Sequence, residues 1–450
     1  MSIQVSPSDF PQVREQVIPA RGSGVGVWML RQFLSKFIRK GTIEIIIPDG
    51  GAFEIGHGAP MVTLRILDQA VAMRLLLDPD MALGEAYSDG TIVIENGDIH
   101  DFLELCLANL GWYDGHWIRT ARSAVRRLVR RISQHNPVSV ARRNVAHHYD
   151  LSSDLYDLFL DADRYYSCAY FLTPDDTLER AQQQKMRHLA AKLLLRPGHR
   201  VLDIGSGWGA LALDLARVAD VDVTGVTLST EQQVFAERRA RETDLQDDVR
   251  FLLKDYRHVE EKYDRIVSVG MFEHVGLPHY REYFAKVRDL LEDDGVAVIH
   301  TIGRADNGGA ANPWIDKYIF PGGYIPALSE IAPAIEQGGL YITDIEILRL
   351  HYAETLKEWR RRFNSNRQRV ADIYDERFCR MWEFYLSLSE AAFRHGGLVN
   401  FQVQLSKSVH AVPLSRNYIG DWEAKNICTM PRFRAAEAAC GSPATGGALG

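Results

Sequence analysis

The amino-acid sequence predicts an α/β protein with a doubly wound, mostly parallel sheet, preceded by a smaller N-terminal α+β domain. Two observations carry this prediction. From about residue 146 onward, short apolar segments typical of buried strands alternate with segments at helical spacing, and this alternation favours a parallel sheet covered by helices. Residues 41–96 instead hold several strand-like segments in succession. With 450 residues, the chain is long enough for two or three domains.

The smaller domain is expected to span residues 1–110. A helix is predicted at residues 28–40, WMLRQFLSKFIRK, where the apolar side chains share one face and most of the cations lie elsewhere. Two strands joined by a turn at PDGG are predicted in GTIEIIIPDGGAFEIG, and MVTLRIL and GTIVIENGD add further strands. An amphipathic helix at residues 99–110, IHDFLELCLANL, is expected to close this domain.

The segment that follows differs sharply in composition. Residues 111–143 contain eight arginines and a single acidic residue, Asp114, and HWIRTARSAVRRLVRRI alternates aliphatic and cationic positions at helical spacing. A solvated linker helix and a helix lying on an anionic membrane fit this pattern equally well. We expect a basic helical linker at 111–145, the main α/β domain at 146–430, and a disordered tail of small and polar residues at 431–450.

Composition and charge narrow the class of protein. The formal net charge of −7 argues against a general nucleic-acid binder. The five cysteines include no CxxC pair, so we expect a reduced, intracellular protein without structural disulfides or zinc. Adjacent residues His147 and His148 would point apart, and no metal site is expected there. No secretory signal pattern and no apolar run of roughly 18–20 residues is present, so any membrane contact is expected to be peripheral.

A glycine-rich turn between a strand and a helix is predicted at residues 201–216, VLDIGSGWGALALDLA. Gly205, Gly207 and Gly209 would let a ligand approach the backbone closely, where a Cβ would block it. A dinucleotide site favours Gly-x-Gly-x-x-Gly with a pyrophosphate at the helix start. Here the spacing is Gly-x-Gly-x-Gly with Asp203 before it, and a carboxylate suits a ligand with an ammonium and a sulfonium. The loop therefore points to S-adenosylmethionine.

Two later strand ends carry side chains suited to the same ligand. VTGVTLSTEQ ends the second strand with Thr227 and Gln232, where a ribose would lie, although methyltransferases typically offer an acidic residue there. LLKDYR places Asp255 and Tyr256 at the end of the third strand, suited to an adenine amino group and ring face. A surface loop without a ligand is the alternative for these residues.

A single cysteine lies among aromatic residues in RYYSCAYFL, residues 164–172. A buried free cysteine usually packs as a small apolar side chain. The alternative is that Cys168 and its neighbours line a reaction chamber.

Taken together, these segments resemble a known family. In order over residues 144–410 the chain contains HHYDLSSDLYDLFLDADRYYSCAYF, VLDIGSGWG, GVTLSTEQ, GMFEHVG, IHTIG, YIFPGGYIP, HYAETLKEW and NFQVQLSK. They resemble the cyclopropane-fatty-acid synthases and the related mycolic acid cyclopropane synthases. RLLLDPDMALGEAYSDG resembles the N-terminal domain of the phospholipid-acting members. The resemblance implies a Rossmann-like class I S-adenosylmethionine-dependent methyltransferase fold. Ser206 stands where the family commonly has cysteine; both are small, so we expect cofactor binding to survive.

The resemblance also implies a reaction, the addition of a methylene group across a cis double bond in a phospholipid acyl chain. Methyl transfer leaves a carbocation, which an apolar chamber must shield from water. Aromatic faces such as those of Tyr165, Tyr170 and Phe171 could stabilise the positive charge. A base must then remove a proton so that the ring closes, and in the family this base is a bound bicarbonate.

The family's anion site maps onto five positions of this chain, with two further residues expected to touch the cofactor. The implied catalytic residues are Cys168, Glu273, His300, Ile302 and Tyr352, and the cofactor contacts are Tyr166 and Ser167. A small anion needs several converging donors in an apolar cavity. Glu273 as a carboxylate would repel the anion, so it is expected to orient His300, to accept a hydrogen bond from the bicarbonate hydroxyl, or to be protonated.

Two alternatives remain open. A fatty-acyl methyltransferase that leaves a methyl or methylene branch would share the cofactor, the substrate and much of the chamber. A noncatalytic lipid-binding scaffold could keep the fold, although the complete set of implied catalytic residues argues against it. The resemblance further implies a homodimer that associates peripherally with an unsaturated phospholipid bilayer on the cytoplasmic face of the membrane.

Overall fold

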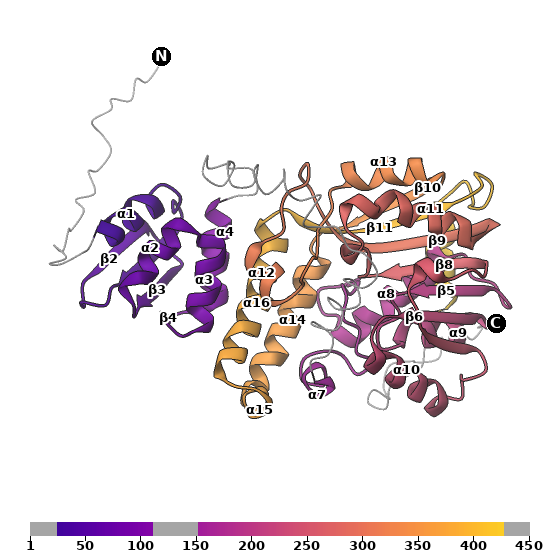
Figure 1. The fold of residues 1–450 in the computed structure, drawn as a ribbon, viewed down its shortest axis with the longest axis horizontal. Helices are drawn as coiled ribbons and strands as arrows, with labels where there is room; N and C mark the ends of the chain where they lie inside the picture. Colours follow the sequence, from indigo (N-terminus) through magenta and orange to yellow (C-terminus); the bar gives the residue numbers. More distant parts are fainter. Residues whose placement is uncertain (1–24, 111–151, 427–450) are drawn as a thin grey trace, which may run out of the picture.

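The computed structural model describes residues 25–110 and 152–426 and contains two sheets (Figure 1). The predicted doubly wound, mostly parallel sheet is confirmed, and a smaller sheet precedes it. The expected basic linker at 111–145 and the expected tail at 431–450 lie outside the described residues, as do His147 and His148. Among the described helices, none combines the length and apolar character needed to cross a bilayer.

The N-terminal unit, residues 25–110, contains a four-stranded sheet of order β2-β1-β3-β4. β1 pairs antiparallel with β2 and parallel with β3, and β3 pairs antiparallel with β4. The elements are α1 (Val25–Leu34), β1 (Gly41–Ile46), β2 (Ala52–His57), β3 (Met61–Ile66), α2 (Gln69–Leu77), α3 (Pro79–Ser88), β4 (Ile92–Asn96) and α4 (Ile99–Leu110). The predicted strands and the predicted helix at 99–110 are therefore confirmed.

The predicted helix at 28–40 is too long, because α1 ends at Leu34. Beyond it the chain turns, and the backbone N–H groups of Arg39 and Lys40 donate to the side-chain oxygen of Asn109 on α4, at 2.8 and 2.9 Å. This tertiary contact replaces the hydrogen bonds that a longer helix would make. Ile38 is nevertheless buried, as its place on the apolar face predicted.

The C-terminal unit, residues 152–426, contains a seven-stranded sheet of order β10-β11-β9-β8-β5-β6-β7. The five strands from β7 to β9 are parallel, whereas β11 runs antiparallel to both β9 and β10. The strands are β5 (Arg200–Ile204), β6 (Asp222–Thr227), β7 (Val249–Leu253), β8 (Tyr263–Val269), β9 (Leu291–Arg304), β10 (Tyr341–Leu348) and β11 (Leu398–Ser406).

Helices cover both faces of this sheet, and alternate residues of one strand show it. Leu202 of β5 packs in a core with α11 and α13, whereas its neighbour Val201 packs in a core with α8 and α9. Successive side chains of a strand point to opposite faces, so a strand buried on both faces favours apolar residues at most positions. The helices and short 3₁₀ turns are α7 (Ser153–Asp157), α8 (Leu178–Lys192), α9 (Ala210–Ala219), α10 (Thr230–Glu242), η1 (Tyr256–His258), η2 (Phe272–His274), η3 (Leu277–His279), α11 (Tyr280–Leu290), α12 (Pro313–Tyr318), α13 (Leu328–Gly338), α14 (His351–Ser365), α15 (Arg367–Ile373), α16 (Glu376–His395) and α17 (Asn417–Lys425).

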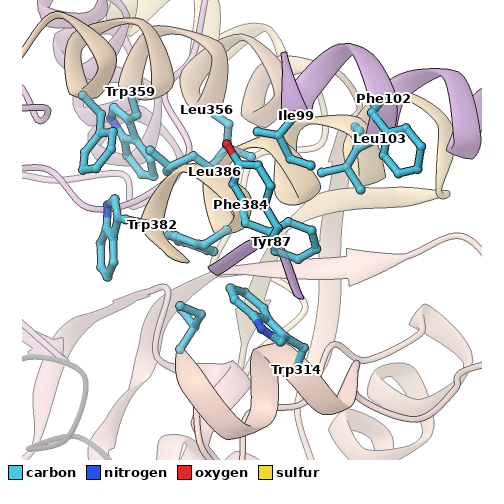
Figure 2. Close-up of a cluster of buried hydrophobic side chains, with 14 of the residues drawn as sticks. Tyr87, Ile99, Phe102, Leu103, Trp314, Leu356, Trp359, Trp382, Phe384 and Leu386 are labelled. Atoms are coloured by element: carbon cyan, nitrogen blue, oxygen red, sulfur yellow. The ribbon is translucent and has the colours of Figure 1, made fainter. Parts of the chain in front are cut away.

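The two units share one hydrophobic core (Figure 2). Tyr87 of α3 and Phe102 of α4 pack in the same cluster as Phe384 of α16, and the Tyr87 hydroxyl donates to Glu383 at 3.0 Å. Gly84 of α3 lies against the fully buried indole of Trp314, where a Cβ would come within 2.5 Å of the ring nitrogen. This close packing holds α3 and α4 against α16 and brings the N-terminal unit next to the site described below.

Candidate active site

The first of two adjoining cavities lies at the carboxyl ends of the parallel strands, where doubly wound folds place their ligands. Its volume is about 160 Å³. All of the predicted cofactor residues except Gly209 line it: Tyr166, Ser167, Asp203, Gly205, Gly207, Thr227, Gln232, Asp255 and Tyr256. Ser206 lines it as well, and its hydroxyl has no hydrogen-bond partner within the described residues.

The three loop glycines serve different purposes. All three have positive φ angles, which favour glycine. A Cβ on Gly207 would meet nothing within 4 Å, so this position leaves open space beside the cavity. A Cβ on Gly209 would come within 2.7 Å of Ala236 and 2.8 Å of Phe251, so Gly209 allows α9 to pack on α10 and β7. Gly209 is predicted to contact the cofactor, but the geometry indicates that it allows helix packing instead.

Asp203 lines this cavity and has one carboxylate oxygen that is unpaired within the described residues. The side chain is buried, and its Oδ2 has no hydrogen-bond partner within the described residues. Burial raises the pKa of Asp203 to about 7, although the nearby Lys185 ammonium opposes the shift. Lys185 also lines the cavity, and its Nζ donates to the Ser167 hydroxyl at 2.8 Å. An unpaired buried carboxylate is costly unless a cationic group meets it, and this fits a ligand that carries an ammonium.

The two strand-end pairs are arranged differently from each other. The Thr227 hydroxyl donates to the Gln232 side-chain oxygen at 2.9 Å, so these residues form one polar patch on the cavity wall. Both oxygens of Asp255 accept hydrogen bonds from Arg257, at 2.9 and 2.8 Å. Burial opposes ionisation of Asp255, but the bonds from Arg257 outweigh it and lower its pKa. Asp255 is thus a satisfied carboxylate at the cavity wall.

A second, larger cavity of about 490 Å³ adjoins the first. Tyr166, Ser167, Gly270 and His274 line both cavities, so the two meet at these residues. All of the implied catalytic residues line this second cavity, which we call the chamber: Cys168, Glu273, His300, Ile302 and Tyr352. The structure therefore brings together residues from four separate stretches of the chain, with His300 and Ile302 both on β9.

Glu273, in η2, has one paired and one unpaired oxygen. Its Oε1 accepts a hydrogen bond from the Ile302 backbone N–H at 2.6 Å. Its Oε2 is buried and has no hydrogen-bond partner within the described residues. Burial raises the pKa of Glu273 to about 7, against the opposing hydrogen bond from Ile302. The expectation that Glu273 orients His300 is wrong for this structure, because the carboxylate bonds to Ile302 instead.

His300 is held by two carboxamides of the neighbouring strand. β11 runs antiparallel to β9, and the side chains of Asn400 and Gln402 lie 3.0 and 3.1 Å from Nε2 and Nδ1 of the ring. Burial, together with the nearby cations Lys185 and Lys192, lowers the pKa of His300 well below its usual range. The ring is therefore neutral at ordinary pH.

Cys168 and Tyr352 complete the group. The Cys168 thiol is fully buried and donates to the Ala169 carbonyl at 3.3 Å, and burial raises its pKa, so it stays protonated. Tyr352, at the start of α14, packs edge-on against Trp359 with ring centroids 5.8 Å apart. Neither environment favours a charged side chain.

The aromatic walls of the chamber are not the ones that the sequence suggested. Tyr165 lines the first cavity instead, and its hydroxyl donates to Asp214 at 2.8 Å. Tyr170 is stacked between His188 and His351, and neither it nor Phe171 borders either cavity. The reason is that consecutive residues of an irregular segment point in different directions. The aromatic residues that line the chamber are Phe33, Phe37, Phe102, Tyr166, Phe320, Tyr324, Tyr352, Phe384, Tyr385 and Phe393.

Sequence reasoning missed the polar residues that support this site. Lys185 lies on the buried face of α8, and the presence of a lysine on that face is the only local sign of a polar site. Asn400 and Gln402 lie in NFQVQLSK, where amides alternate with apolar residues in a strand buried on both faces. Because buried amides need partners, that alternation could have indicated a polar site beside the strand.

The N-terminal unit supplies much of the chamber wall, which the sequence did not indicate. The lining residues from this unit are almost all apolar: Leu30, Phe33, Leu34, Phe37, Ile38, Ile45, Leu64, Leu75, Pro79, Asp80, Leu83, Phe102, Leu103, Cys106 and Leu107. The chamber thus continues from the polar cluster around Glu273 into a region bounded by α1 and α4.

Comparison with known proteins gives consistent results. The family model for mycolic acid cyclopropane synthetase matches residues 138–403. The chain is 38% identical over 378 residues to cyclopropane-fatty-acyl-phospholipid synthase of Escherichia coli K12, covering 81% of this chain and 96% of that protein. It is 36% identical to a probable fatty acid methyltransferase of Pseudomonas putida, covering 82% and 93% of the two chains.

A solved structure agrees in fold and sequence. The mycolic acid cyclopropane synthase CmaA1 complexed with SAH and CTAB superposes with a TM-score of 0.56 at 34% identity, covering 59% of this chain and 97% of that one. The fold, the two adjoining cavities and these matches lead to one conclusion, that the chain belongs to the mycolic acid cyclopropane synthetase family.

Proposed function

We propose that this protein is an S-adenosylmethionine-dependent cyclopropane synthase that converts the cis double bond of an unsaturated phospholipid acyl chain into a cyclopropane ring. The observation that carries this proposal is the junction of a polar cavity with a large apolar chamber at Tyr166, Ser167, Gly270 and His274. The first cavity suits a polar cofactor, and the second suits an acyl chain. The 38% sequence identity to the Escherichia coli synthase, over 81% of this chain and 96% of that protein, supports this assignment.

The cofactor's charged groups match the first cavity. The unpaired Oδ2 of Asp203 would hold an ammonium, Gly207 leaves room beside the backbone, and Thr227 and Gln232 would bond ribose hydroxyls. When bound, S-adenosylmethionine supplies an electrophilic methyl group. Tyr166 and Ser167 line both cavities, so they would position the two reactants, and such positioning contributes much of the rate enhancement when the nucleophile is poor.

The chamber residues have two tasks. The apolar walls exclude water from the positive charge that develops on the acyl chain, and the faces of Tyr166 and Tyr385, whose hydroxyls lie 2.8 Å apart, can stabilise that charge. The polar cluster must accept a proton. We propose that bicarbonate binds among Cys168, Glu273, His300, Ile302 and Tyr352 as the base, and the unpaired Oε2 of Glu273 would accept a hydrogen bond from its hydroxyl.

We propose that the acyl chain extends from the chamber into the N-terminal unit. An acyl chain that leaves the bilayer needs apolar surroundings in place of the lipid tails, because exposing it to water would be costly, and the N-terminal lining is almost entirely aliphatic and aromatic. The depth available there would then limit how far the chain can extend beyond the double bond.

We also propose that the N-terminal unit rests on the cytoplasmic face of an anionic bilayer and that the protein is a homodimer. Trp28 and Met29 on α1 are large apolar side chains exposed by 59% and 44%, and the exposed cations Lys36, Arg39 and Lys40 follow them. Such a surface combines apolar insertion with attraction to anionic lipid. The dimer is proposed from the family resemblance, and sedimentation velocity measurements of the oligomeric state test it.

The reaction itself is tested with methyl-labelled S-adenosylmethionine and vesicles of unsaturated phospholipid. We expect label in the acyl chain, and mass spectrometry should find a product that takes up no hydrogen on mild hydrogenation, because a ring resists it and a methylene branch does not. Bicarbonate should restore activity lost in carbonate-free buffer. No incorporation at any bicarbonate concentration would refute the proposal, and uptake of two hydrogens would support the branching alternative.

Glu273→Gln should lower kcat by about 100-fold, because the amide must direct its one oxygen to the Ile302 N–H and would present a donor where the bicarbonate hydroxyl needs an acceptor. The same substitution should also change how the free energy of unfolding depends on pH. In the folded protein the pKa of Glu273, about 7, lies above its ordinary value of 4.5. The contribution of Glu273 to the free energy of unfolding is therefore complete below pH 4.5 and is lost as the pH rises through 7. The wild type should therefore lose roughly 3 kcal/mol more than the variant between those limits.

Chemical denaturation across this pH range measures the difference. Glu231→Gln, at an exposed position on α10, is the matched control and should follow the wild type. Parallel pH dependence in the wild type and Glu273→Gln would show that the folded protein does not hold this proton.

Leu107→Trp should shorten the acyl site, because Leu107 of α4 lines the chamber and a larger ring would fill it. We expect the ratio of kcat/KM for long over short acyl segments beyond the double bond to fall by about 10-fold. Leu67→Trp, at a position exposed by 52%, is the control and should keep the wild-type ratio. An unchanged ratio in a folded Leu107→Trp variant would place the chain elsewhere.

Replacing Trp28 and Met29 together by alanine should weaken sedimentation with anionic vesicles, and high salt should weaken wild-type binding because it screens the cations. Tyr341→Ala, an exposed site on β10 of the C-terminal unit, is the control. If high salt does not weaken wild-type binding and the double substitution does not weaken vesicle binding either, another surface of the protein contacts the membrane.

A further inference from the structure

We infer that Lys192 acts through Gln402 to fix the tautomer of His300, with Nδ1 as acceptor and Nε2 as the protonated nitrogen. Lys192 and Gln402 are then positioning residues, and His300, which donates through Nε2 to Asn400, cannot serve as the base. The role of this arrangement in the chamber rests on the proposed function, whereas the tautomer itself does not.

The starting point is that both ring nitrogens of His300 face a carboxamide. Gln402 Nε2 lies 3.1 Å from Nδ1, and Asn400 Nδ2 lies 3.0 Å from Nε2. A neutral imidazole has one donor and one acceptor nitrogen, so the two amides must present opposite atoms to it. One of the two amides therefore has to direct its oxygen toward the ring.

Lys192 decides which amide does so. Its side chain is fully buried, and its Nζ donates to Gln402 Oε1 at 2.8 Å and to Glu346 Oε2 at 2.5 Å. An ammonium only donates, so Gln402 must direct its oxygen to Lys192 and its Nε2 to the ring. His300 Nδ1 consequently accepts, and its lone pair is occupied.

Asn400 must then accept. With Nδ1 as the acceptor, His300 Nε2 carries the proton and needs an oxygen at 3.0 Å, so the Asn400 amide presents Oδ1 to the ring. The alternative amide orientation leaves Oδ1 buried without a partner in the described part of the chain, so this rotation also satisfies that atom. Asn400 lines the chamber, and its Nδ2 then takes the buried position that Oδ1 holds in the other orientation.

The ammonium that sets this order is itself held in place away from the chamber. Glu346 of β10 also contacts His188 of α8 at 2.7 Å, and Glu423 of α17 contacts the other nitrogen of that ring at 2.7 Å. None of the three residues borders the chamber. A buried ionic network therefore sets, through one amide, the protonation pattern of a ring in the chamber.

The tautomer is measured by NMR on full-length protein labelled with ¹⁵N-histidine, with a His300→Gln variant to assign the signal. We expect the wild type to show His300 protonated at Nε2. Gln402→Glu should invert this pattern, because a carboxylate between Lys192 and the ring accepts from Nδ1–H. Its kcat should fall by about 100-fold, the loss typical of one preorganised donor, with the KM for S-adenosylmethionine unchanged.

Two further variants separate positioning from a structural effect. Gln404→Glu buries the same carboxylate two residues along β11, where Gln404 contacts the Lys192 carbonyl and Tyr418 rather than His300, and it should keep the wild-type tautomer. Lys192→Met should free Gln402 to rotate, so that His300 populates both tautomers.

Protonation at Nδ1 in the wild type would overturn the inference. So would a folded Gln402→Glu variant with the wild-type tautomer and kcat. Because the NMR measurement needs no turnover, failure of the proposed reaction would leave the tautomer assignment intact, and the two failures can be told apart.

Discussion

The structure depends on one constraint, the need to keep a few polar groups in an apolar chamber without water. Each buried polar atom there requires a partner within the protein or in a ligand. His300 finds two carboxamides and the Ile302 N–H finds Glu273, whereas Glu273 Oε2 and Asp203 Oδ2 have no partner within the described residues. One carboxylate in the lining of each cavity thus carries an unpaired oxygen.

The sheet meets this constraint through its topology. The carboxyl ends of the parallel strands β5, β6, β7 and β8 lie at one edge of the sheet, and the loops that follow these ends form the first cavity. The antiparallel insertion of β11 beside β9 then places Asn400 opposite Ile302 and Gln402 opposite His300 in register. The polar cluster is therefore a consequence of strand order.

The N-terminal unit extends the chamber and turns an apolar face outward as well. Leu30 and Phe33 of α1 line the chamber, while Trp28 and Met29 of the same helix are exposed. A single short helix thus lies between the chamber and the outer surface. The packing of α3 and α4 on α16 holds this arrangement, and the tight fit of Gly84 against Trp314 leaves little freedom in it.

The sequence by itself determined the doubly wound sheet, the N-terminal strands and the glycine turn, because strand periodicity and turn chemistry are local properties. The candidate residues of the chamber came instead from the resemblance to a known family, and all of them line the chamber. Only the tertiary structure decided the end of α1 at Leu34, the bond of Glu273 to Ile302, and the distance of Tyr170 from the chamber. It also placed Gln402 between Lys192 and His300, in contact with both. These outcomes depend on contacts between segments far apart in the chain, and no local pattern records which partner a buried polar group will find.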